Sequence, residues 1–194
     1  MSQTDLHSQP LARPATLSRP VRLGLAVVLG AIAVALAAQA EIKLPFTPIP
    51  VTLQGGMVAL VGAVLGARLG AAALVTYLAA GAIGIPVFAG GGAGAFHLVG
   101  PTGGYLLAFP VAAAVAGSIA RPGAHLRSIL AVLAGIAVIF IGGMAQLMVL
   151  GLASSPAAAW SLGAAPFIGG DLVEGAIAGL LAARLRGPVS RRLQ

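Results

Sequence analysis

Long apolar runs, separated by short segments rich in proline, glycine or arginine, set the pattern of hydrophobic and polar positions along this chain. A helix needs about 20 predominantly apolar residues to cross a bilayer, and prolines at short intervals end a regular helix. The pattern therefore predicts an all-α integral membrane bundle of six transmembrane helices, at about 21–40, 55–66, 70–85, 103–120, 127–152 and 166–185.

Three of the connections between these helices are long and unusual: 41–54, 86–102 and 153–165. Closely spaced prolines prevent regular helix in the first. The second is Gly-rich and uncharged, and we expect it to be non-helical. Irregular backbone cannot face lipid, because its N–H and C=O groups would lack partners, so this segment lies outside the bilayer or lines a protein cavity. The strand–helix setting of a nucleotide-binding loop is absent.

Composition supports a membrane protein and argues against several other classes. Hydrophobic residues make up 59% of the chain and charged residues 8%, against about 25% charged in soluble domains, so a soluble fold would lack a polar shell. A net charge of +7 would suggest nucleic-acid binding in a polar protein. Here the arginines flank apolar runs, and nucleic acid is not expected as a partner. The absence of cysteine excludes disulfides and zinc–thiolate sites.

The basic residues predict an orientation in the membrane. Ten of the eleven lie at one set of helix ends, and Lys43 alone falls in a connection on the other side. Because cytoplasmic loops carry the Lys/Arg excess of membrane proteins, we expect both termini in the cytoplasm and the three long connections outside. A basic surface of this kind also suits the anionic head groups of the lipid bilayer.

The chain divides into three expected regions. Residues 1–20, rich in Ser, Pro, Gln and Thr, are expected to form a disordered cytoplasmic tail. Residues 21–186 form the six-helix membrane domain, and 187–194 a basic cytoplasmic C-terminal tail. A signal peptide is the alternative for the first apolar run, which ends in small residues resembling a cleavage site. That run is long enough to span a bilayer, which favours a retained first helix.

Two acidic residues stand out within an apolar setting. Asp171 and Glu174 are three apart near the outer start of the last predicted helix, so they share one face of it. Acidic residues inside transmembrane segments usually face the bundle interior or a wet cavity, because exposure to lipid is costly. A substrate or proton site is one interpretation. A pair at the membrane interface, stabilised by the helix dipole, is the other.

Other polar residues suggest binding or packing more than catalysis. No hydrolase or metal-binding motif occurs, so we expect no catalytic, metal or cofactor site. His97, in the Gly-rich segment, is either a solvated or packing residue or a ligand contact. Gln54 closes the Pro-rich connection and is a candidate ligand contact; its alternative role is to join helices by hydrogen bonds. Ala31 and Ala35 form a small-residue stripe on the first helix, suited to close helix packing.

Three segments carry a family resemblance. They read Pro-Phe-Thr-Pro-Ile-Pro-Val-Thr-Leu-Gln at 45–54, Gly-Ile-Pro-Val-Phe-Ala-Gly-Gly-Gly at 84–92 leading to Gly-Pro-Thr-Gly-Gly-Tyr at 100–105, and Pro-Phe-Ile-Gly-Gly-Asp at 166–171. Each is weak alone. Together, in this order and spacing, they resemble the BioY family, the biotin-specific substrate-binding (S) components of energy-coupling-factor transporters.

The resemblance implies a compact six-helix bundle in a bacterial or archaeal plasma membrane, which captures biotin in an outward-facing cavity. Asp171 matches the family's acidic position and would accept hydrogen bonds from the ureido N–H groups of biotin. Gly91 and Gly92 would supply backbone groups to the ligand. The other candidate substrate contacts are Gln54, His97, Tyr105, Lys43 and Glu174.

The resemblance also shows one departure, and it implies partners. Glu174 stands where the family usually has Lys, so Lys43 becomes the candidate partner for the ligand carboxylate or for Glu174 itself. Transport would require a transmembrane coupling component and two ATPase subunits, since this chain has no Walker motif. Ala31 and Ala35 resemble the family's docking face for that coupling component.

Other functions stay open on the sequence. The alternatives to biotin capture are an S component for another small molecule and a proton-coupled carrier that uses Asp171 and Glu174. An intramembrane enzyme that uses the same acids belongs to a different class, and persistent binding of an unchanged ligand would argue against it. A structural membrane scaffold would leave the three family-like segments unexplained.

Overall fold

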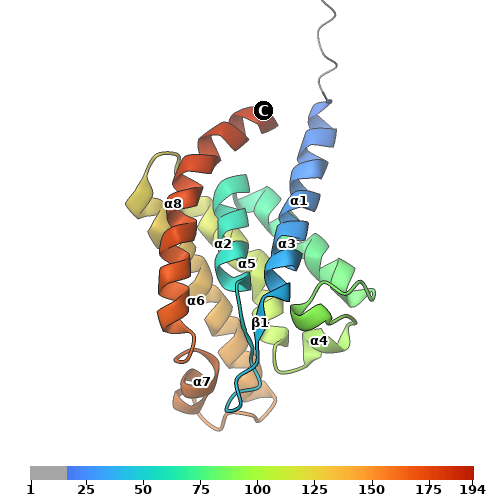
Figure 1. Ribbon diagram of the computed structural model, residues 1–194, viewed down its shortest axis with the longest axis vertical. Helices are drawn as coiled ribbons and strands as arrows, with labels where there is room; N and C mark the ends of the chain where they lie inside the picture. Colours follow the sequence, from blue (N-terminus) through green and yellow to red (C-terminus); the bar gives the residue numbers. More distant parts are fainter. Residues whose placement is uncertain (1–16) are drawn as a thin grey trace, which may run out of the picture.

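The computed structural model describes residues 17–194, and these residues are predominantly helical (Figure 1). Most of the tail predicted at 1–20 therefore lies outside the described residues. The helical elements are α1 (Arg19–Gln39), α2 (Gln54–Leu65), α3 (Ala67–Ala82), the 3₁₀ turn η2 (Ala89–Gly91), α4 (Phe96–Val99), α5 (Gly103–Ile119), α6 (His125–Val149), α7 (Pro156–Gly163) and α8 (Ile168–Leu193). The six predicted helices correspond to α1, α2, α3, α5, α6 and α8.

Among the described residues, the length and apolar composition of the helices are those of a membrane protein. The helices α1 and α6 are each long and apolar enough to cross a membrane, and α7 with α8, bent by 64° at their junction, would add a third span. The helices α2, α3 and α5 are apolar but only 12, 16 and 17 residues long. The predicted count of six spans therefore depends on these three shorter helices.

The centre of the bundle is formed by α2 and α5. The helix α5 packs against α6, α3 and α2, while α2 also packs against α8 and α1. Gly62 on α2 lies so close to Ala113 on α5 that a Cβ at residue 62 would overlap the Ala113 backbone. Small residues at such contacts let two helices pack backbone against backbone, which suits a bundle with few bulky core side chains.

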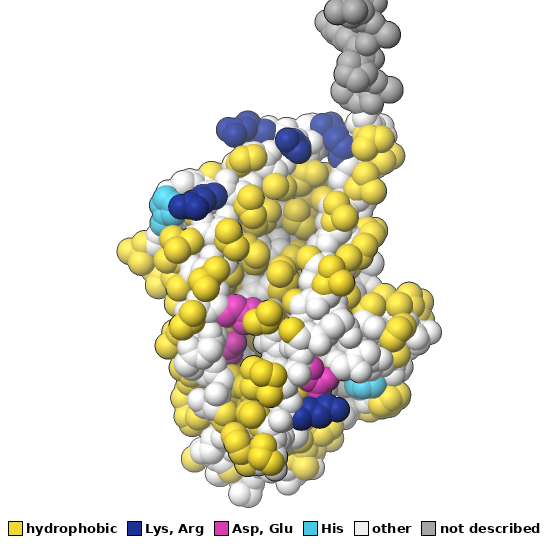
Figure 2. Space-filling view, viewed as in Figure 1, with side chains coloured by type: hydrophobic (Ala, Val, Ile, Leu, Met, Phe, Trp, Pro, Cys, Tyr) yellow, Lys and Arg dark blue, Asp and Glu magenta, His cyan; other side chains and the backbone are white. Residues whose placement is uncertain are grey.

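Arginines at one end of the bundle bind the last carbonyls of the central helices. Arg186 on α8 donates hydrogen bonds to the carbonyl oxygens of Ala63 (2.7 Å) and Gly117 (3.0 Å). Arg127 donates to the carbonyl of Ile119 (2.7 Å). Carbonyls in the last turn of a helix have no partner within the helix. Figure 2 shows basic side chains gathered at this end, where α1 begins and α8 ends in Figure 1.

The opposite end holds the three long connections, and they contain more structure than predicted. In the first, β1 (Glu41–Ile42) and β2 (Val51–Thr52) pair antiparallel, with Glu41 opposite Thr52. We call residues 41–53 the outer strap. The second, residues 86–102, is called the glycine loop below. The prediction that it is non-helical is wrong, because it contains η2 and α4; glycines with positive φ lie within η2 (Gly90 and Gly91) and between the two turns (Gly94).

The third connection, 153–165, contains the helix α7, which was not predicted. Ser155 is its N-cap and accepts a 3.2 Å hydrogen bond from the backbone N–H of Ala158, and Pro156 occupies the first helical position. Both features favour the start of a helix. The last helix also runs further than expected, through Pro188 to Leu193, so most of the predicted tail at 187–194 is helical.

Candidate functional site

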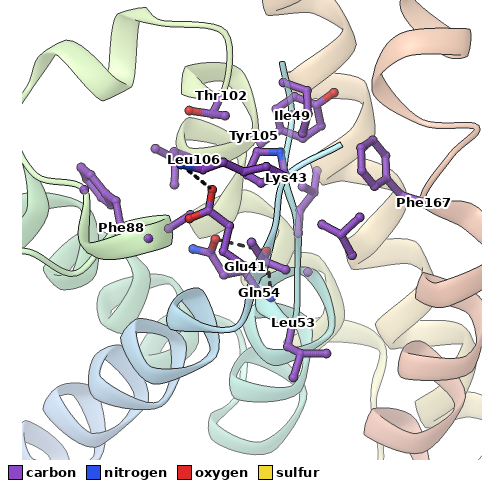
Figure 3. A pocket seen from close by; sticks show the side chains of 18 of the residues that line it. Glu41, Lys43, Ile49, Leu53, Gln54, Phe88, Thr102, Tyr105, Leu106 and Phe167 are labelled. Carbon is purple, nitrogen blue, oxygen red and sulfur yellow. Dashed lines mark hydrogen bonds and ion pairs between the residues drawn. The ribbon is translucent and has the colours of Figure 1, made fainter. Parts of the chain in front are cut away.

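A cavity of about 570 Å³ lies between the outer strap, the glycine loop and the helices α2, α5, α6 and α8 (Figure 3). Small-molecule sites in proteins have volumes of about 300–1,000 Å³. The eight residues that the sequence singled out as substrate contacts all line this cavity, although they come from distant parts of the chain. They are Lys43, Gln54, Gly91, Gly92, His97, Tyr105, Asp171 and Glu174.

Asp171 and Glu174 form the acidic wall. Both project from the outer half of α8 toward the N-terminal end of α2. Asp171 Oδ1 lies 3.8 Å from the place that a Cβ on Gly55 would occupy, and the Glu174 side chain packs directly against Gly56. The absence of a side chain at Gly56 therefore makes room for Glu174. The acidic side chains lie around a hollow in the face shown in Figure 2.

Gln54 is held in one orientation by neighbours on both sides. Its Nε2 donates a 2.8 Å hydrogen bond to the hydroxyl of Tyr77, and that hydroxyl donates to the carbonyl of Val87 (3.1 Å). Its Oε1 accepts from the hydroxyl of Thr52 (3.3 Å). Gln54 thus joins α2, α3, the outer strap and the start of the glycine loop. This linking role was the alternative to ligand contact in the sequence interpretation, and the two are compatible here.

Hydrogen bonds from Tyr105 and Thr47 join the end of α7 to α5 and to the outer strap. The Tyr105 hydroxyl donates a 2.8 Å hydrogen bond to the carbonyl of Gly163, so its ring lines the cavity while its hydroxyl is already bonded. Thr47, in the outer strap, donates a 2.8 Å hydrogen bond to the carbonyl of Leu162. The strap is therefore tied across the cavity to the end of α7.

His97 lies in the glycine loop with its ring between two aromatic neighbours. Its ring centroid is 4.2 Å from that of Phe96 and 5.5 Å from that of Phe88. The Nε2 side of the ring lies against Gly92. Its Nδ1 atom is buried and has no hydrogen-bond partner among the described residues.

Sequence reasoning missed one charged residue of the site. Glu41 lines the cavity, and its Oε1 lies 3.8 Å from Nζ of Lys43. The spacing of the two residues was the available signal, because positions i and i+2 of an extended segment lie on one face. The pairing of Lys43 with Glu41 differs from the pairing with Glu174 that the sequence suggested.

Three phenylalanines that were not assigned to the site form much of its apolar wall. Phe88, Phe109 and Phe167 all line the cavity and are almost completely buried. Phe88 also meets Tyr77 edge to face, with ring centroids 5.6 Å apart. An apolar wall with a few fixed polar groups is the usual design of a small-molecule site. The arrangement therefore suits a small ligand with an apolar body and polar ends.

Ala31 and Ala35 require a correction. The sequence assigned them to a surface for a partner protein, but Ala31 is buried in the core, and Ala35 packs at the edge of the same hydrophobic cluster. The face of α1 that remains exposed is formed by larger apolar residues, Leu25, Leu29, Ile32 and Leu36. The small alanines instead let α1 pack against α2 and α3 of the same chain.

Comparison with known proteins shows the family. The BioY family model matches residues 9–191. The probable biotin transporter BioY of Pyrococcus horikoshii is 42% identical over 149 residues, which cover 76% of this chain and 87% of that protein. The biotin transporter BioY of Thermotoga maritima is 40% identical over 148 residues, covering 76% of this chain and 86% of that protein.

A solved structure shares the fold. The S-component for biotin from an ECF-type ABC transporter superposes with a TM-score of 0.78 at 23% sequence identity, covering 89% of this chain and 95% of that chain. The family match extends over almost all of the sequence, and it includes each segment that lines the cavity. The chain belongs to the BioY family.

Proposed function

We propose that this chain captures biotin as the substrate-binding S component of an energy-coupling-factor transporter. One observation carries the proposal: the outer strap, the glycine loop and the start of α8, which are far apart in sequence, line one cavity of a size suited to a small ligand. The relatives named as biotin transporters supply the identity of the ligand. The protein acts as a transporter component and not as an enzyme.

The chemistry of the cavity wall suits biotin. The fused rings and the valeryl chain are apolar and match the phenylalanine wall. Asp171 accepts hydrogen bonds from the ureido N–H groups, and the ring of His97 forms part of the wall. Gln54, Tyr105, Gly91 and Gly92 shape the remaining surface. A buried polar wall of this kind discriminates strongly against analogues that lack the matching group.

The cavity faces the outside of the cell in this proposal. The arginines lie at the opposite end of the bundle, and a Lys/Arg excess marks the cytoplasmic side. Both termini are then cytoplasmic, in a multi-pass plasma-membrane protein with six spans. The short helices α2, α3 and α5 cross the bilayer packed against one another, and α2 also contacts α1, α6 and α8. A transmembrane coupling component and two ATPase subunits complete the transporter.

Calorimetry on the purified full-length chain with biotin tests the proposal. We expect saturable binding at a 1:1 ratio, with the ligand recovered unchanged. A folded sample that releases or absorbs no heat with biotin would refute biotin as the ligand. Uptake of radiolabelled biotin into vesicles, measured with and without the coupling component and ATPases, then tests the assignment as an S component, since uptake should require the partners and ATP.

A further inference from the structure

Glu41 and Lys43 form a loose ion pair at the edge of the cavity. The Lys43 side chain is 85% exposed, whereas that of Glu41 is 12% exposed, and the distance between Nζ and Oε1 is 3.8 Å (Figure 3). This separation is longer than a direct hydrogen bond, and Lys43 lies in solvent, where a single ion pair holds a long side chain only weakly. Lys43 can therefore leave Glu41 at small cost, while Glu41 stays fixed in the wall.

The second oxygen of Glu41 rests against the glycine loop. A Cβ on Gly90 would overlap Oε2 of Glu41, and Gly90 has a positive φ of 60°. A glycine here both adopts the left-handed conformation and leaves room for the carboxylate. The space that the glycine loop offers to an anion is thus occupied, in part, by a carboxylate of the chain itself.

The charges that line the cavity are unbalanced. Among the described residues, three carboxylates line it, those of Glu41, Asp171 and Glu174, but Lys43 is the only lysine or arginine that does so. A ligand that ends in a carboxylate therefore finds one cation, and Glu41 already pairs with it. A ligand with an uncharged tail needs no such partner.

We infer that Glu41 sets the preference of the cavity for the charge of the ligand tail, by competing with an anionic tail for Lys43. The inference rests on the proposed function, because it assigns a selectivity to the same biotin site. Glu41 acts here as a positioning residue. It pairs with Lys43, and it fills space beside the glycine loop that an anionic ligand would otherwise use. Biotin and biotinamide, which share rings and chain but differ in tail charge, report this selectivity directly.

The test compares the two ligands by calorimetry on the full-length chain. In Glu41→Gln, we expect biotin affinity to rise roughly two- to fivefold, the range for a loose ion pair with one partner in solvent, while biotinamide affinity stays unchanged. Lys43→Gln should weaken biotin and spare biotinamide. When Lys43→Gln is already present, adding Glu41→Gln should not change biotin affinity, because no lysine is left for Glu41 to release. The gain in Glu41→Gln should shrink at high salt.

Three results overturn the inference. The first is an unchanged biotin affinity in Glu41→Gln. The second is a gain of the same size when Lys43 is absent. The third is an equal gain in Glu174→Gln. This variant is the matched control, because it removes a lining carboxylate that forms no ion pair with Lys43. An equal gain would show that the total charge of the cavity, and not the ion pair, controls affinity. If the folded wild-type chain binds neither ligand, the proposed function fails instead, so the two failures are distinguishable.

Discussion

The side-chain amide of Gln54 donates a 2.8 Å hydrogen bond to the hydroxyl of Tyr77, and both residues are buried beneath the cavity. Tyr77 donates in turn to the carbonyl of Val87, so a single phenol links the first residue of α2 to the start of the glycine loop. Two walls of the cavity therefore depend on one buried hydroxyl group.

Replacing Tyr77 with phenylalanine should destabilise the fold and loosen the site. The change leaves the amide of Gln54 and the carbonyl of Val87 without their partner, and an unsatisfied buried polar group costs about 1–3 kcal/mol. Thermal unfolding in detergent measures the loss, and calorimetry measures weaker biotin binding. Thr76→Val is the control, because that exposed hydroxyl bonds only within its own helix. Equal unfolding temperatures for the two variants would contradict the structural role of Tyr77.

Replacing Asp171 with asparagine should weaken biotin binding without unfolding the protein. The change keeps the shape of the side chain but removes the charge that accepts the ureido N–H groups. Loss of a hydrogen bond to a charged group is worth about 1.5–3 kcal/mol, or roughly a 10- to 150-fold weaker Kd. Calorimetry gives the affinity, and the unfolding temperature verifies the fold. An unchanged Kd would rule out this role for Asp171.

Replacing Gly56 with alanine should disturb the ligand site through Glu174. A Cβ at this position overlaps the Glu174 side chain, which is flexible and would be displaced from the wall. We expect weaker biotin binding with a small change in stability. The matched control is Gly169→Ala, also in the first turn of a helix, because no atom lies within 4 Å of the added Cβ. The prediction is wrong if both variants bind biotin like the wild type.

Replacing Thr47 with valine should speed the release of biotin. The change removes the 2.8 Å hydrogen bond from the outer strap to the carbonyl of Leu162, and with it a longer 3.3 Å bond from the backbone N–H of Ile49, while keeping the size of the side chain. Since a hydrogen bond contributes about 1 kcal/mol net, we expect dissociation roughly fivefold faster. A chase of labelled biotin measures the rate. Ser161→Ala serves as control, because that hydroxyl bonds within α7; equal rates in both variants would show that the strap does not limit release.

Local sequence patterns were sufficient for the helical frame and for the position of the site. The helices α1 and α6 could be predicted as membrane spans, because the length and hydrophobicity of a span depend only on consecutive residues of the sequence. The arginines at the helix ends indicated an orientation for the same reason. The segments at 45–54, 84–105 and 166–171 all contribute to the cavity wall, since each is a compact motif that can be read without knowing the fold.

Only the tertiary structure decided how these parts face one another. Ala31 was assigned to a docking face for a partner protein, yet it is buried within the chain, because a helix's small-residue stripe does not reveal which neighbour covers it. Glu41 escaped notice as the neighbour of Lys43, for which the sequence had suggested the ligand carboxylate or Glu174, because the position of Glu41 depends on the path of the outer strap past the glycine loop. The sequence by itself determined the class of protein, the six long helical segments and eight of the residues that line the cavity. Contacts between segments distant in sequence decided which charges meet and which helix faces are covered, because such contacts depend on packing in three dimensions.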